Sequence, residues 1–190
     1  MIGPGSGGLR KDRFYVQQNI KNHNLLKVPN DFRAYLGWSP LPAELPATAS
    51  ARKIILVVKG LAFLGWYENG KLVGDTHACI GKKRAWTRSG LHRVMEKDID
   101  HVSSKYRSAY GYPSFMPYAL RIYGQVWIHG GDVTGGNCSH GCINLPLDTA
   151  ERLYAWTKPG TIVVIVETSE ELGPMIEKRP KLFGVKQGKR

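Results

Sequence analysis

The sequence predicts a mainly β domain with one principal helix, and three observations carry this prediction. Two continuous apolar, β-branched runs, 54–58 and 161–166, are typical of strands buried on both faces. Asn69-Gly70 between two apolar segments is a strong hairpin signal, because both residues tolerate positive φ. The clearest helical spacing of apolar residues lies in 148–157.

The predicted elements follow one another in a simple order. The strand 54–58 leads into a hairpin with strands at 61–67 and 72–80, then a basic loop at 81–89 and a short strand at 90–94. Strands at 119–123 and 125–129, the helix 148–157 with Asp148 as its N-cap, and the strand 161–166 complete the domain.

The segment 95–115 is harder to interpret. It carries mixed charge and several tyrosines, and it is too long for a plain connection between two strands. Long connections of this kind are commonly functional. We therefore expect an insertion, which is either a lid bordering an active site or an ordinary excursion packed on the surface.

Composition limits the class of protein and its partners. A chain of 190 residues is long enough for one domain with a sizeable core. Its 27 Lys and Arg against 15 Asp and Glu give a net charge of +12, which favours an anionic partner such as an acidic cell-wall polymer, unless it only solubilises the surface. No recognition helix, RNP-like segment or finger spacing indicates specific nucleic-acid binding. No apolar run approaches the roughly 18 residues of a transmembrane segment.

We divide the chain into three parts. Residues 1–50 form an N-terminal tail or arm, Gly-rich at 1–8 and ending in a Pro-rich linker, 51–167 form the domain, and 168–190 form a basic C-terminal tail. The N-terminus lacks the apolar core of a signal peptide. The protein is then cytosolic, or its targeting segment is not present in this chain.

Residues 123–145 contain the candidate site. An apolar strand ends at His129, a glycine-rich loop follows, and Ser139-His140-Gly141-Cys142 precedes a second apolar step. This order is typical of a Cys/His nucleophile pair, in which an imidazole generates the reactive thiolate and later supplies a proton. Glycines in the loop leave backbone N–H groups uncovered, as an oxyanion hole requires.

The three cysteines, Cys79, Cys138 and Cys142, allow two other interpretations. An odd number cannot pair completely, so at least one thiol is free or pairs between chains. A Cys138–Cys142 disulfide is conceivable and would inactivate the nucleophile. A zinc site built from His129, Cys138, His140 and Cys142 is a rival, although the spacing fits no common finger. We predict no metal and no cofactor.

The segment 123–145 resembles the signature of the L,D-transpeptidase catalytic domain (YkuD-like) family, in which a strand histidine precedes Ser/Thr-His-Gly-Cys. The resemblance extends over residues 52–167. The segments 53–58 and 66–73 resemble the opening hairpin of that family. The segment 87–94 resembles its Thr-Pro-x-Gly-x-x-x-Val segment, and 116–120 its strand leading to the histidine.

The resemblance implies an L,D-transpeptidase-like β-sandwich with the principal helix after the catalytic cysteine. Cys142 would be the nucleophile and His129 the general base, oriented by the backbone carbonyl of Gly130, with Asp132 as a rival orienter. Cys142 precedes the helix, so the helix dipole could stabilise its thiolate. The remaining motif residues would line the substrate region, supply oxyanion donors or hold the loop: Ser139, His140, Gly141 and Asn144.

The reaction implied is attack by Cys142 on a peptidoglycan tetrapeptide stem, a thioester acyl-enzyme, and a 3-3 cross-link made with a neighbouring stem. Water as acceptor would make an L,D-carboxypeptidase, and a lipoprotein lysine would make an anchoring transferase; a non-catalytic cell-wall-binding module is a further alternative. Carbapenem β-lactams would acylate Cys142, and the protein would lie in the periplasm or cell envelope. One departure is that only thirteen positions separate His129 from Cys142, a loop shorter than usual in the family.

Overall fold

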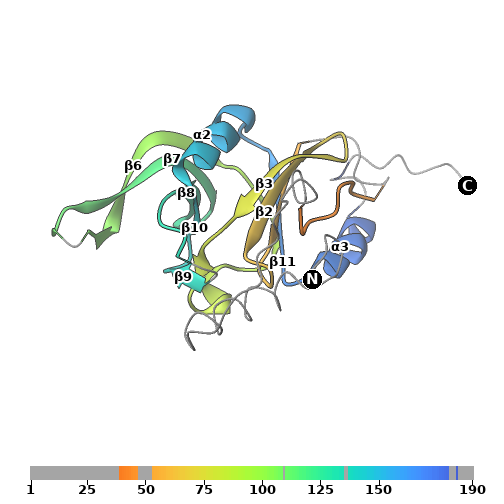
Figure 1. Cartoon of the computed structure of the whole chain (residues 1–190), viewed down its shortest axis with the longest axis horizontal. Coiled ribbons are helices and arrows are strands. Elements are labelled where there is room, and N and C mark those ends of the chain that lie inside the picture. Colours follow the sequence, from red (N-terminus) through yellow and green to blue (C-terminus); the bar gives the residue numbers. More distant parts are fainter. Residues whose placement is uncertain (1–38, 47–52, 109, 135–136, 180–182, 184–190) are drawn as a thin grey trace, which may run out of the picture.

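The computed structural model describes residues 39–46, 53–108, 110–134, 137–179 and 183 (Figure 1). The strands are β1 (Ile54–Val58), β2 (Phe63–Glu68), β3 (Lys71–His77), β4 (Ile80–Gly81), β5 (Gly90–Arg93), β6 (Glu96–Arg107), β7 (Pro113–Tyr123), β8 (Val126–Gly130), β9 (Asn137–Ser139), β10 (Ile143–Leu145) and β11 (Ile162–Val166). The helical elements are η3 (Arg84–Trp86), α2 (Leu147–Trp156), η4 (Ser169–Glu171) and α3 (Leu172–Lys178).

The first sheet has the strand order β3-β2-β1-β11-β5. Its central strands β1 and β11 run parallel, and every residue of both is buried, as the two β-branched runs predicted. Asn69 and Gly70 connect β2 to β3 with φ values of 53° and 79°, so the hairpin expected there is confirmed.

The second sheet, of order β10-β8-β7-β6, positions the candidate site. β7 and β8 form an antiparallel pair that turns at Gly124, which has a φ of +46°. β10 runs parallel to β8, with Asn144 opposite His129. Cys142 directly precedes β10 and therefore lies at the start of the strand that pairs with β8.

The two sheets pack face to face around one apolar core, which confirms the β-sandwich. Side chains of both sheets meet there, and α2 adds Ala150 and Leu153. The other buried members include Ile55, Val57, Leu64, Trp66, Leu120, Ile122, Ile128, Ile143, Leu145, Val163 and Ile165. Burial of so many large apolar side chains is the main source of stability for a domain of this size.

The outer face of the first sheet has a core of its own, and this corrects the expected C-terminal tail. Leu172 and Ile176 of α3 and Phe183 are buried against β1, β2 and β11, together with Leu41 and Leu45 of the proline-rich segment. The polar and basic composition after residue 168 concealed the apolar side of this short helix. Residues 1–38 and 184–190, where the tails were also expected, lie outside the described part of the chain.

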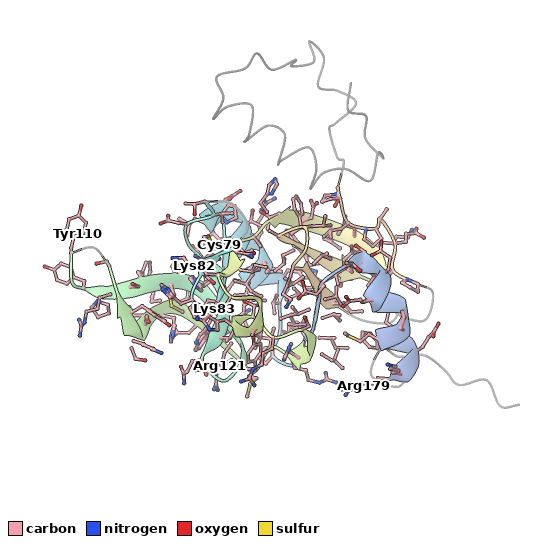
Figure 2. The ribbon with its side chains drawn as sticks, turned by 90° about the horizontal axis from the view of Figure 1, so that it is seen from below. Cys79, Lys82, Lys83, Tyr110, Arg121 and Arg179 are labelled. Atoms are coloured by element: carbon pink, nitrogen blue, oxygen red, sulfur yellow. A yellow bond between two sulfur atoms is a disulfide. The ribbon has the colours of Figure 1, made fainter. Side chains whose placement is uncertain are left out.

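The segment 95–115 contains β6 and the start of β7, which pair as an antiparallel hairpin with a register shift between Val102 and Arg107. It projects from the body of the domain, with Tyr110 at its outer end (Figure 2). Tyr110 is 88% exposed, and most β6 side chains are exposed or half-buried. Because neither face of β6 is uniformly apolar, the usual alternation signal of a strand is weak here.

The principal helix begins one residue earlier than expected. Pro146 is the N-cap of α2, and Asp148 lies in the first turn rather than at the cap. None of the described helices has the length and apolar character needed to cross a membrane.

Candidate active site

His129 lies near the end of β8 with only 6% of its surface exposed. Its Nδ1 lies 2.8 Å from the carbonyl oxygen of Gly130. A carbonyl can only accept, so Nδ1 carries the proton and Nε2 is left as the basic nitrogen. This is the orienting contact expected of Gly130 rather than of Asp132.

The pKa of His129 is lowered, chiefly by burial. The hydrogen bond to Gly130 opposes this effect, and the charge of His101 adds to it. His101, on β6, stacks on Trp127 with ring centroids 4.0 Å apart, and its Nδ1 lies 2.9 Å from Asp98 Oδ2. The sequence did not identify His101 as part of the site, because it lies in the segment whose structure the pattern could not define.

Cys142 is half-buried and is the free thiol among the described cysteines. It packs against Met116, Ala119 and Trp127, and its Sγ donates to the carbonyl oxygen of Gln125 at 3.8 Å. Burial raises the pKa of the thiol. The expected help from the helix dipole is absent because β10 intervenes and α2 begins only at Leu147.

These pKa directions define how the pair can react. At neutral pH both the thiol and the imidazole are uncharged, rather than a preformed thiolate–imidazolium pair. A neutral imidazole with a free Nε2 can accept the thiol proton as the sulfur attacks a carbonyl.

Hydrogen bonds within the loop hold the residues around Cys142. The Ser139 hydroxyl donates to the Cys142 carbonyl oxygen and accepts the Gly141 N–H at 3.0 Å. Asn144 Nδ2 donates to the Asp132 carbonyl oxygen at 3.1 Å. Ser139 and Asn144 thus make the loop-holding contacts expected of them, but the Gly141 N–H is already engaged and is not a free oxyanion donor in this structure.

The segment 79–87 is bonded to the loop that carries Cys142 by a disulfide and by backbone hydrogen bonds. A disulfide joins Cys79 to Cys138, with their Cα atoms 5.5 Å apart. Cys79 and Asn144 exchange backbone hydrogen bonds of 2.9 and 2.8 Å, and the Lys82 N–H donates to the Ser139 carbonyl oxygen at 2.8 Å. The disulfide contradicts the Cys138–Cys142 pairing and removes Cys138 from the possible zinc ligands.

Thr87 makes a further contact between this segment and the loop. Its buried hydroxyl donates to the Gly141 carbonyl oxygen at 2.8 Å and accepts the Gly81 N–H at 2.9 Å. Lys59 Nζ donates to the Thr87 carbonyl oxygen at 3.1 Å and lies 2.6 Å from Glu167 Oε1. Gly141 itself has a φ of +127°, and a Cβ there would lie 3.2 Å from the Trp86 carbonyl oxygen, so a larger residue would strain the loop. The sequence gives Thr87 no role of its own beyond its place in the segment 87–94, which resembles a segment of the family.

His140 is exposed and lies between two aromatic rings. Its imidazole stacks on Tyr106 of β6 at 4.6 Å and on Trp86 of η3 at 5.9 Å, measured between ring centroids. His140 thereby connects the loop that carries Cys142 to the β6–β7 hairpin, a contact that the sequence pattern does not predict.

Comparison with known proteins places this geometry in a family. The family model described as "L,D-transpeptidase catalytic domain" (YkuD) matches residues 52–165. L,D-transpeptidase 2 of Mycobacterium tuberculosis (strain CDC 1551 / Oshkosh) is 31% identical over 137 residues, which are 66% of this chain and 32% of that protein. The chain thus spans about a third of the curated relative that it matches.

Solved structures show the same fold. An L,D-transpeptidase from Xylanimonas cellulosilytica aligns with a TM-score of 0.56 at 22% identity, over 70% of this chain and 66% of that one. The LD transpeptidase LdtMt1 in complex with imipenem aligns with a TM-score of 0.53 at 24% identity, over 60% and 58%. With the matching family model and the Ser-His-Gly-Cys loop beside the strand histidine, these findings show that the chain belongs to the L,D-transpeptidase catalytic domain family.

Proposed function

We propose that this protein is a cysteine-dependent L,D-transpeptidase that acts on peptidoglycan tetrapeptide stems and forms 3-3 cross-links. The observation that carries the proposal is a free thiol at Cys142, the residue just before β10, together with a buried His129 on the neighbouring strand β8, whose Nδ1–H is fixed by the Gly130 carbonyl. Membership of the family supports the choice of reaction class.

In the proposed reaction, the Cys142 sulfur attacks the carbonyl that follows the L-centre of the stem's diamino acid while His129 Nε2 takes the thiol proton. The tetrahedral intermediate collapses, the C–N bond to the terminal D-alanine breaks, and the imidazolium returns the proton to the leaving amine. A thioester remains on Cys142. The side-chain amine of a second stem attacks this thioester, the thiolate leaves, and His129 moves the proton from the new amide nitrogen to the sulfur.

The neutral thiol and imidazole of the free protein make His129 a true base in this scheme. Its pKa is lowered by burial, so it is uncharged and able to accept a proton at neutral pH. Because the thiol pKa is raised, little thiolate is present at neutral pH in the free protein. This arrangement protects the nucleophile from side reactions between turnovers.

A location in the periplasm or cell envelope is part of the proposal. The Cys79–Cys138 disulfide supports it, because disulfides persist mainly in oxidising compartments. The net charge of +12 supports it as well, since an acidic wall polymer attracts a cationic surface.

The acyl-enzyme tests this function most simply. The protein is mixed with a tetrapeptide stem, quenched in acid, and measured by intact-mass spectrometry beside Cys142→Ala. We expect an added mass equal to the acyl tripeptide in the wild type and none in the variant. If neither protein gains mass nor releases D-alanine, the catalytic proposal fails and a wall-binding module is favoured.

A further inference from the structure

A pocket of about 520 Å³ lies beside the nucleophile. Its wall combines η3 and the residues just after it, the outer part of β6, the β7–β8 turn and His140. Gln125, whose backbone carbonyl accepts a hydrogen bond from the Cys142 thiol at 3.8 Å, lines the pocket, and so does Tyr123. A ligand in this pocket would therefore touch the same surface as an acyl group on Cys142.

One wall of the pocket is a stack of three rings. His140 lies between Trp86, at 5.9 Å, and Tyr106, at 4.6 Å. A lysine covers each end of the stack: Lys83 Nζ lies 5.4 Å from the centre of the Trp86 ring, and Lys105 Nζ lies 5.6 Å from that of Tyr106. Cation–π contacts of this kind hold each ammonium group near its ring, and of the two lysines Lys105 lines the pocket.

The charge of the pocket has one sign. Among the described residues that line it, Arg88 and Lys105 are cationic and none is acidic. The Arg88 backbone is fixed, because its N–H donates to the Tyr123 hydroxyl at 2.7 Å and that hydroxyl donates to the Trp86 carbonyl oxygen at 3.3 Å. An arginine and a lysine in a pocket with an aromatic wall suit a carboxylate carried on a short apolar group.

We propose that Arg88 and Lys105 are specificity-determining residues that bind a free carboxylate of the acyl-donor stem. Stems in which that carboxylate is amidated should then bind more weakly. The inference rests on the proposed function and adds the charge state of its substrate. A carboxamide of the same shape would lose the ionic part of the contact while keeping the packing on Trp86, His140 and Tyr106. The two cationic side chains are solvent-exposed, so we expect a moderate discrimination, on the order of tenfold.

The test uses two tetrapeptide stems that are identical except that the free carboxylate of one is a carboxamide in the other. Binding of each to the Cys142→Ala protein is measured by calorimetry, and KM and kcat are measured with the wild type. We expect about tenfold weaker binding and higher KM for the carboxamide stem, with similar kcat. Arg88→Gln/Lys105→Gln should bring the two stems to equal affinity, and Arg88→Lys/Lys105→Arg should restore part of the preference.

A matched control removes the same charge elsewhere. Lys71 and Lys158 are exposed and do not line the pocket, so Lys71→Gln/Lys158→Gln should keep the preference. Turnover of both stems with equal KM and equal affinity would overturn this inference and leave the proposed function standing. Loss of the preference in the control as well would also overturn it, since the net charge alone would then explain the effect. Binding with the preference but without turnover would support the inference and contradict the proposed function.

Discussion

Thr87 and Gly141, which are 54 residues apart in the chain, are joined by a 2.8 Å hydrogen bond from the threonine hydroxyl to the glycine carbonyl. The same hydroxyl accepts the Gly81 N–H, so one buried group connects β4, the segment after η3 and the loop that carries Cys142. The position of the nucleophile therefore depends on a residue that does not itself react.

Thr87→Val should weaken both stability and catalysis. Valine has nearly the same shape but leaves the Gly81 N–H and the Gly141 carbonyl without a partner in a buried site, which costs about 1–3 kcal/mol of unfolding free energy. Urea unfolding and the acylation rate measure the two effects. Thr87→Ser keeps the hydroxyl and is the matched control. A valine variant with wild-type stability and acylation rate would show that this bond does not support the loop.

Removing the disulfide should destabilise the domain and loosen the loop. The link spans 59 residues, for which the chain-entropy relation gives a stabilisation of about 4 kcal/mol. We expect Cys79→Ala/Cys138→Ala to unfold at a markedly lower temperature and to acylate more slowly. The first check is chemical: a maleimide added to the unreduced, denatured protein should label Cys142 alone, and labelling of all three cysteines would contradict the pairing.

The Cys142 thiol should react as an ordinary protonated thiol at neutral pH. Because burial raises its pKa above the usual 9.0, the thiolate fraction and the rate of iodoacetamide alkylation should rise about tenfold per pH unit through neutral and mildly alkaline pH. His129→Gln should leave this profile unchanged. A pH-independent plateau at neutral pH, lost in His129→Gln, would instead indicate a thiolate–imidazolium pair.

The fall of kcat/KM at acid pH should reflect protonation of His129. Burial holds its pKa below the usual 6.5, and only the neutral imidazole accepts the thiol proton, so kcat/KM should fall only when the pH drops below about 6.5. Rates measured across the acid range locate this fall. Loss of activity already between about pH 7 and 8 would contradict a depressed pKa for the base.

A carbapenem should acylate Cys142. The prediction rests on the proposed function, because the thiol that attacks a stem carbonyl would also attack the strained β-lactam carbonyl. Intact mass should increase by one inhibitor in the wild type and stay unchanged in Cys142→Ala. An unchanged mass in the wild type, under conditions where a tetrapeptide forms an acyl-enzyme, would contradict this prediction.

Local sequence pattern predicted the elements in which a strand is buried on both faces, or in which a turn contains residues that tolerate positive φ. β1, β11 and the Asn69-Gly70 hairpin are of this kind. The β6–β7 hairpin and α3 were missed because their polar or exposed side chains hide the period on which such predictions depend.

For the site, the motif pointed to His129, Gly130 and Cys142, because all three lie in one short segment, 129–142, with a recognisable order of residues. Thr87, His101 and Tyr106 reach the loop only through tertiary packing, and local spacing does not specify such contacts. The Cys79–Cys138 pairing was out of reach for the same reason, since connectivity is a property of the fold.

Transpeptidation by Cys142 can be measured from the products that a disaccharide-tetrapeptide gives with the wild type and with Cys142→Ala, analysed by mass spectrometry. We expect a dimer one D-alanine lighter than two substrates, formed by the wild type and absent with the variant. Tripeptide without dimer would show that water is the acceptor and would replace the transpeptidase by a carboxypeptidase. Turnover that persists in Cys142→Ala would contradict the account, because the sulfur of that residue is the proposed nucleophile.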